Sequence, residues 1–144
     1  MSTRVLAIDF GRKRLGLAIS DPERKIASPL ANYTRTSRGA DLAYLKKVIA
    51  AEEPGTLLIG LALHNSGAES ELSKAARAFG KWLGEETELP VCFWDERYSS
   101  VMAEKELWQA GLTHRRRKER RDMVAAQMVL EAWLEAGCPA GREE

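Results

Sequence analysis

The order of the apolar segments along the chain limits the folds that it can form. Three strand-like segments come first, at Arg4–Asp9, Leu15–Ser20 and Ile26–Tyr33. After them, segments with helical periodicity alternate with two continuous apolar runs, Thr56–Leu61 and Val91–Asp95, which are typical of strands buried on both faces. A strand that follows a helix in this way is set parallel to a neighbouring strand. The sequence therefore predicts an α/β fold with a mixed five-stranded sheet flanked by helices.

Four helices are expected between and after these strands. The first covers 39–53, the second contains the apolar stripe of 72–83, and the third follows an N-cap at Ser99 or Ser100 and ends at Gly111. The last helix is expected to begin at Asp122 and to end near Ala136. This order of elements is that of the ribonuclease H-like fold. Because 144 residues suit one compact domain, we expect 1–136 to form a single domain and 137–144 a flexible tail.

Charge and hydropathy exclude several classes of protein. Lys and Arg number 22 against 21 for Asp and Glu, so the net charge of +1 gives no general affinity for nucleic acid. Six of these cations are nonetheless concentrated at positions 115–121, which indicates a local anion-binding patch. No apolar run approaches the roughly 20 residues needed to cross a bilayer, so we expect a cytoplasmic protein without membrane contact.

Acidic residues stand where the predicted strands end and where the last helix begins. Asp9 ends the first strand, Asp95 and Glu96 end the last strand, and Asp122 opens the last helix at the head of its apolar stripe. In open sheets, ligands bind outside the carboxyl ends of parallel strands. Converging carboxylates repel one another unless a cation joins them, and hard Mg²⁺ or Mn²⁺ prefers their oxygens. The pattern predicts a divalent-metal site at this edge of the sheet.

Each of these acidic residues also has a simpler explanation. Asp122 would serve as an N-cap or a helix-dipole partner, a role worth about 0.5–2 kcal/mol. The sequence Asp95-Glu96-Arg97 would form a solvated turn with an ion pair. Asp9 is harder to explain in this way, because carboxylates are poor strand residues and this one directly follows the apolar run VLAI.

Basic residues stand next to the acidic ones along the chain. Arg12, Lys13 and Arg14 follow Asp9, beside glycines that permit close approach to the backbone. The run 115–121, which contains Arg117 and Lys118, leads directly into position 122. These cations are placed to hold phosphates on either side of a scissile bond. The alternative for the run is a solvated helix end without a binding role.

Four motifs in this order resemble those of the YqgF family of Holliday-junction-resolvase-like proteins. They are Asp9-x-Gly11 with Arg14-x-Gly16-x-Ala18, Gly60-Leu61 with Gly67, Asp95-Glu96-Arg97-x-Ser99-Ser100-x-x-Ala103, and Asp122-x-x-Ala125-Ala126. The resemblance covers about 4–134 and implies a ribonuclease H-like nuclease dependent on Mg²⁺ or Mn²⁺. It assigns the catalytic and metal-binding roles to Asp9, Glu96 and Asp122, with Asp95 adjacent. The motifs also bring Arg97 into the expected set of substrate contacts. One departure is the loop after Gly60-Leu61, which has Ala62 and His64 where the family usually has Pro and Asn.

The function expected from these residues is hydrolysis of phosphodiester bonds in structured RNA or branched DNA. The resemblance implies processing of the pre-16S rRNA 5′ end, cleavage of Holliday-junction-type DNA, or both. We expect a monomer or weak homodimer, because no coiled coil or long exposed apolar stripe indicates a dimer face. The alternative is a non-catalytic nucleic-acid-binding or ribosome-assembly factor on the same fold. A further alternative, an ATP-handling protein of actin-like ancestry, would need two such domains, which 144 residues do not supply. Three carboxylates favour the enzyme, because binding alone needs only the cations.

Overall fold

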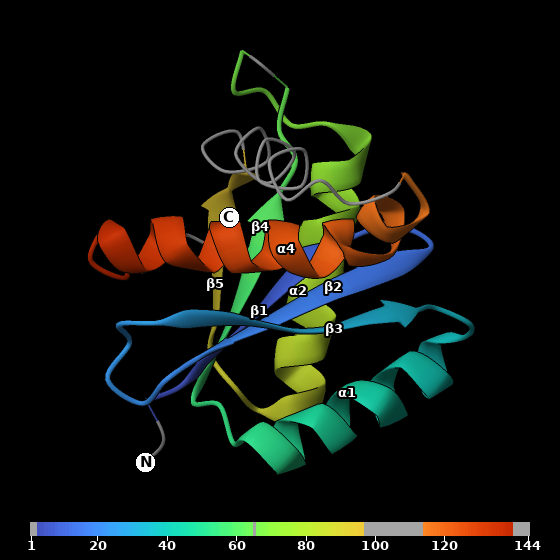
Figure 1. Cartoon of the computed structure of the whole chain (residues 1–144). Coiled ribbons are helices and arrows are strands. Elements are labelled where there is room, and N and C mark those ends of the chain that lie inside the picture. Colours follow the sequence, from blue (N-terminus) through green and yellow to red (C-terminus); the bar gives the residue numbers. More distant parts are fainter. Residues whose placement is uncertain (1–2, 65, 97–113, 140–144) are drawn as a thin grey trace.

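The strands of the chain form one sheet, and helices cover both of its faces (Figure 1). The computed structural model describes residues 3–64, 66–96 and 114–139, and for 114–122 it describes the backbone. The elements, in chain order, are β1 (Val5–Phe10), β2 (Arg14–Ser20), β3 (Ala27–Thr34), α1 (Arg38–Glu52), β4 (Thr56–Leu61), α2 (Glu71–Thr87), β5 (Val91–Asp95) and α4 (His114–Glu135).

The five strands are arranged in the order β3-β2-β1-β4-β5. The first three form an antiparallel meander, and β4 and β5 are added parallel to β1. Each of the two parallel strands follows a helix, as a crossover connection requires. The predicted mixed five-stranded sheet is confirmed, and the fold is that of the ribonuclease H-like class.

Alternation along the strands divides the core between the two faces of the sheet. On β1, Leu6 and Ile8 belong to the core that includes Leu45 of α1 and Leu83 of α2. Side chains of the opposite parity belong to a second core, which contains Val5, Ala7 and Leu58 from the sheet and Val129, Leu130 and Trp133 from α4. Figure 1 shows α4 in front of the sheet and α2 behind it. The parity of β1 therefore places Asp9 on the face that α4 covers.

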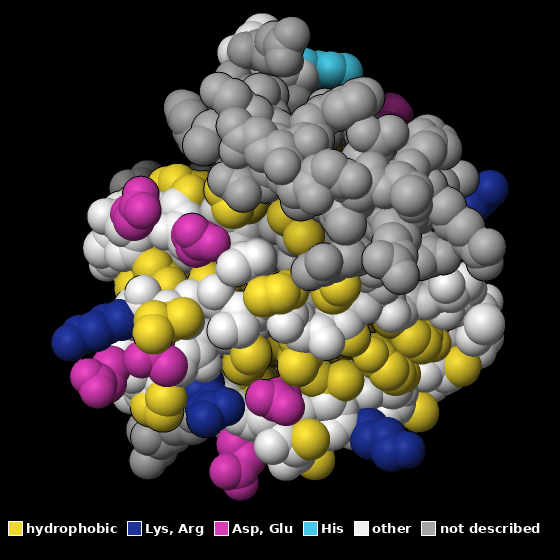
Figure 2. All heavy atoms as spheres, viewed as in Figure 1, with side chains coloured by type: hydrophobic (Ala, Val, Ile, Leu, Met, Phe, Trp, Pro, Cys, Tyr) yellow, Lys and Arg dark blue, Asp and Glu magenta, His cyan; other side chains and the backbone are white. Residues whose placement is uncertain are grey.

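The β3 strand forms one edge of the sheet and is only partly covered. Its central residues are half-buried, and Ser28, Pro29 and Thr34 are exposed. Figure 2 shows hydrophobic side chains in a band between α4 and α1, over this strand. Among the described residues, no helix is both long and apolar enough to cross a membrane.

The last helix begins earlier than the sequence predicts. It starts at His114 and includes the basic run, so Asp122 lies about two turns inside it and the N-cap explanation of Asp122 is wrong. Arg and Lys are good helix formers, and nothing in the run breaks the helix. The apolar stripe marks where the helix meets the sheet rather than where it begins. The predicted helix of 99–111, Arg97 and residues 140–144 of the predicted tail lie outside the described residues.

Packing of α4 against the sheet generates a first prediction. Leu130 is fully buried on α4, so Leu130→Ala should lower the free energy of unfolding by about 2–5 kcal/mol through lost contacts and a residual cavity. The control is Ile26→Ala, because Ile26 is 63% exposed and its truncation should cost less than about 0.5 kcal/mol. Urea denaturation of both variants measures the difference, and equal midpoints would contradict the described docking of α4.

Candidate active site

Asp9 lies in a row of residues that crosses the whole sheet. The register pairs Asp9 with Gly16 on one side and with Gly60 on the other. Gly16 pairs in turn with Asn32, and Gly60 with Trp94. Neighbouring strands are only about 4.8 Å apart, so side chains at these two glycine positions would crowd the Asp9 carboxylate. The two glycines leave space beside it on both sides.

Glu96 fills the space above one of these glycines. A Cβ atom built on Gly60 would lie 2.8 Å from Cγ and 2.9 Å from Cδ of Glu96. Glu96 follows β5 directly and is only 7% exposed. Its side chain therefore crosses from the end of β5 over β4, toward the position next to Asp9. The chain brings these two carboxylates together from strands that are not adjacent in the sheet.

This arrangement fits a hard divalent cation. The Glu96 side chain lies over Gly60, the strand neighbour of Asp9, so the two residues bring carboxylates to neighbouring positions, and carboxylate oxygens are the ligands that Mg²⁺ and Mn²⁺ prefer. Among the described residues, no three His, Cys, Asp or Glu side chains group closely enough to hold a metal ion. The third predicted ligand, Asp122, has its backbone in α4 and its side chain outside the described residues. Alternation along β5 assigns Asp95 to the face of Phe93, opposite the α4 face.

A side chain that sequence reasoning missed holds α4 to the same row. Asn32 Oδ1 accepts a hydrogen bond of 2.8 Å from the backbone N–H of Met123, the residue that follows Asp122. Ala126, one turn further along α4, is fully buried against the sheet. The α4 segment at position 122 is thus fixed to the row that contains Asp9. The signal in the sequence was a lone amide between apolar residues of β3, and it gave no sign of its partner.

The predicted cations lie in three parts of the chain. Arg12 and Lys13 are exposed in the loop between β1 and β2, and Arg14 is half-buried where β2 begins. Arg117 and Lys118 lie on the first turns of α4, with side chains outside the described residues. His64 donates its backbone N–H to the carbonyl of Ala68, which closes the loop after β4.

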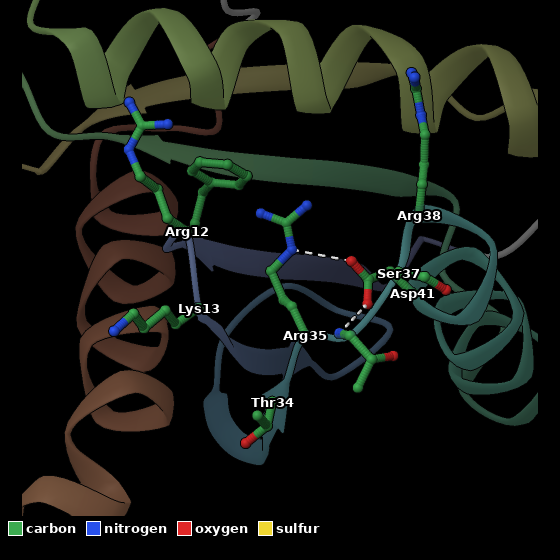
Figure 3. A pocket seen from close by; sticks show the side chains of 9 residues that line it. Arg12, Lys13, Thr34, Arg35, Ser37, Arg38 and Asp41 are labelled. Carbon is green, nitrogen blue, oxygen red and sulfur yellow. Dashed lines mark hydrogen bonds and ion pairs between the residues drawn. The ribbon is translucent and has the colours of Figure 1, made fainter.

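A pocket of about 580 Å³ opens on the other face of the same sheet end (Figure 3). It is lined by Phe10, Arg12, Lys13, Thr34, Arg35, Thr36, Ser37, Arg38 and Asp41. Sequence reasoning found Arg12 and Lys13 but missed Arg35 and Arg38, because these two stand at the junction of β3 and α1, far from any acidic motif. The pocket is therefore more basic than the sequence indicated.

Asp41 is the one acidic residue among the described residues that line this pocket, and it is buried. Its carboxylate accepts hydrogen bonds from Tyr33 Oη at 2.9 Å, from Arg35 Nε at 3.0 Å and from the backbone N–H of Thr36 at 3.2 Å. Burial raises the pKa of Asp41, but these hydrogen bonds and the charge of Arg35 outweigh it, so the pKa lies below its ordinary value of 3.8. The ionised form is the stable one in the folded protein.

The lowered pKa of Asp41 predicts a pH dependence of stability. The contribution of Asp41 is fully present above its unfolded-state pKa and is lost as the pH falls through the lower folded-state value. Asp41→Asn should cost roughly 1.5–3 kcal/mol at pH 7 and should flatten the fall in stability below about pH 4. Denaturation of both proteins between pH 2.5 and 7 measures this, and parallel curves would show that Asp41 does not carry the effect.

The comparisons with known proteins agree with this geometry. A family model described as "RuvX: Holliday junction resolvase" matches residues 3–136. A relative from Maridesulfovibrio salexigens is 44% identical over 131 residues, covering 91% of this chain and 97% of its own length. A relative from Koribacter versatilis is 42% identical over 132 residues, covering 92% of this chain and 86% of its own length. Both carry the name "Putative pre-16S rRNA nuclease".

Solved structures of resolvases share the fold at low sequence identity. Thermus thermophilus RuvC, in complex with a Holliday junction substrate, superposes with a TM-score of 0.57 at 16% identity, over 94% of this chain and 96% of that one. The Fowlpox virus resolvase, also with Holliday junction DNA, gives a TM-score of 0.60 at 12% identity, over 95% of this chain and all of that one (100%). The match of nearly the whole sequence to one family model, and the identity of these relatives, confirm the prediction made from the four motifs: the chain belongs to the RuvX family of Holliday-junction-resolvase-like proteins.

Proposed function

We propose that the chain is a divalent-metal-dependent nuclease that acts on the 5′ end of pre-16S rRNA. The observation that carries the proposal is the placement of Glu96 over Gly60, beside Asp9, in a chain of this family. A protein that only bound nucleic acid would gain nothing from two carboxylates at this place, because they repel phosphate. The non-catalytic alternative therefore does not explain why Asp9 and Glu96 lie at neighbouring positions.

RNA is favoured as the substrate by the relatives. Those named for the pre-16S rRNA are 42% and 44% identical to the chain, whereas the resolvases solved with junction DNA are 16% and 12% identical and share only the fold. Cleavage of branched DNA is the second candidate, favoured by the description of the family model. Cutting one rRNA end needs a single active site, so a monomer or weak homodimer in the cytoplasm is the form that we propose.

The residues that would hold Mg²⁺ or Mn²⁺ are Asp9 and Glu96, with Asp122 as the third proposed ligand, whereas the predicted role of Asp95 as a ligand is not carried further because Asp95 is assigned to the opposite face of the sheet. When bound, the ion would supply positive charge to the phosphate oxygens and to the leaving group. Asp9 lies on the central strand, between two paired neighbours, so its position is held by the sheet ladder on both sides. Glu96 is nearly buried, and burial limits the directions in which its carboxylate can turn.

The cations would position the substrate. Arg12, Lys13 and Arg14 follow Asp9 closely in the chain, so they would contact phosphates of the strand that is cut. Arg97 follows Glu96, and Arg117 and Lys118 precede Asp122, which gives each proposed ligand a neighbouring cation. Contacts of this kind neutralise phosphate without reading the base sequence. Selectivity would then come from the shape of a structured RNA.

The proposal predicts that removing either described carboxylate stops cleavage without unfolding the protein. Asp9→Asn and Glu96→Gln should each lower kcat more than roughly 100-fold. Replacing a residue that only hydrogen-bonds to a metal ligand typically lowers activity about 10–100-fold, and loss of a ligand itself should cost more. Glu86→Gln is the control, because Glu86 is an exposed acid on α2. The assay uses Mn²⁺ with a pre-16S RNA, an unstructured RNA and a four-way DNA junction. Near-normal rates for Asp9→Asn at saturating Mn²⁺ would refute the site.

A further prediction tests the close contact between Gly60 and the Glu96 side chain. In Gly60→Ala, the new Cβ would lie 2.8 Å from Glu96 Cγ, so the Glu96 side chain must move away from Asp9. Cleavage should fall as far as it does in Glu96→Gln, while the melting temperature changes little, because a side chain rather than the backbone gives way. Gly39→Ala is the matched control: no atom lies within 4 Å of a Cβ there, and an alanine in α1 should stabilise by about 0.5–1 kcal/mol. Full activity of Gly60→Ala would show that Glu96 is not part of the active site.

A further inference from the structure

The pocket on the α1 and α2 side of the sheet has no role in the arrangement of carboxylates. Asp9 and Phe10 are successive residues of β1, so their side chains point to opposite faces, and Phe10 lines the pocket. Arg12 lies three residues after Asp9, which limits the separation of their Cα atoms to about 11 Å. The pocket and the carboxylates therefore share one end of the sheet and are joined by the loop between β1 and β2.

The charges of the pocket are unbalanced. Four cationic side chains line it against the single carboxylate of Asp41, and that carboxylate is already paired with Arg35 at 3.0 Å. Within the described ranges, Arg12, Lys13 and Arg38 have neither a hydrogen bond nor an ion pair from their side chains. Figure 3 shows Arg12 and Arg38 on either side of Arg35, with their side chains extending in the same direction. An anion that enters between Arg12 and Arg38 would meet two cations without an acidic partner, whereas the Lys13 side chain extends away from Arg35 (Figure 3).

The pocket is also built before any ligand arrives. Arg35 donates from Nη1 to the carbonyl of Gly11 at 3.1 Å, and its backbone N–H donates to the carbonyl of Lys13 at 2.8 Å. These bonds tie the loop that carries Arg12 to the end of β3. Arg38 is positioned separately, because its guanidinium lies over the Trp82 ring at 4.8 Å from the centroid. Prior positioning of this kind lowers the entropy cost of binding.

We propose that this pocket binds a backbone phosphate of the nucleic-acid substrate, outside the place where the bond is cut. The proposal rests on the proposed function and adds Arg35 and Arg38 to the residues that hold the substrate. Exposed hydroxyls of Thr34, Thr36 and Ser37 complete a lining suited to phosphate oxygens.

The pocket is suited to a phosphate rather than to a base. Bases bind to proteins by stacking on aromatic rings, and the aromatic ring in the lining, Phe10, is covered by the Arg35 guanidinium at 5.1 Å from its centroid. A contact made only to phosphate is independent of sequence. The pocket should therefore hold the path of the strand without selecting its bases.

The test compares two double variants that remove the same charge. Arg12→Ala with Arg38→Ala empties the pocket of two cations, and Lys46→Ala with Lys47→Ala removes two exposed cations from α1 outside it. Binding is measured by fluorescence anisotropy in EDTA, with a labelled pre-16S RNA and an unrelated RNA of equal length, at several salt concentrations. The pocket variant should raise Kd about tenfold for both RNAs and reduce the slope of log affinity against log salt by at least about 0.7. The lysine variant should change both quantities far less.

Additional variants and a cleavage assay distinguish failure of this inference from failure of the proposed function. Arg12→Lys with Arg38→Lys keeps the charge and should recover most of the binding, and melting curves show whether each variant is folded. In Mn²⁺, the Ala variant should raise KM for cleavage more than it lowers kcat. If the Arg12→Ala, Arg38→Ala variant has the same Kd and salt slope as the lysine control, the pocket does not bind phosphate, even if the protein cuts RNA. If the wild type binds RNA but cuts no substrate, the proposed function fails, and the Kd comparison still decides the pocket.

Discussion

A carboxylate on the central strand of a buried sheet is the constraint on which the rest of this structure depends. Asp9 is half-buried in β1, between two paired strands, where proteins normally place apolar side chains. An acidic group at such a place is costly unless its surroundings provide space and a cation. Gly16 and Gly60 provide the space, since each stands opposite Asp9 in the register. The catalytic proposal follows from how the neighbouring elements use that space.

Two elements come to this row from different directions. Glu96 reaches it from the end of β5, over Gly60, and α4 is held to it through the bond from Met123 N–H to Asn32. The helix is further fixed by Gln127, whose side-chain amide donates to the carbonyl of Ala27 on the same strand. Because β3 is an edge strand, its polar side chains are free of the sheet interior and can serve as anchors for α4. The edge strand β3 thus supplies polar anchors for α4, in addition to the packing of α4 against the inner strands.

The end of the sheet separates charge by face. Asp9 and Glu96 lie on the α4 face, and the basic pocket opens on the face of α1 and α2, with the loop between β1 and β2 joining them. Alternation along β1 produces this separation, because Asp9 and Phe10 point to opposite sides. A negatively charged strand that crosses the sheet end would meet attraction on one side and, in the absence of a cation, repulsion on the other. On the proposed function, a metal ion at the carboxylates would remove this repulsion and let the substrate approach.

The sequence alone determined the sheet and the family. Continuous apolar runs such as Thr56–Leu61 identify buried strands with little ambiguity, because their signal is local, and the four ordered motifs identified the relatives. The start of α4 was missed, since the basic run gives no apolar stripe until the helix meets the sheet. The glycines beside Asp9 were visible, but their pairing with it was not. Only the tertiary structure placed Glu96 over Gly60, Asn32 against α4 and Arg38 in a pocket with Arg12, because each of these depends on contacts between segments far apart in the chain.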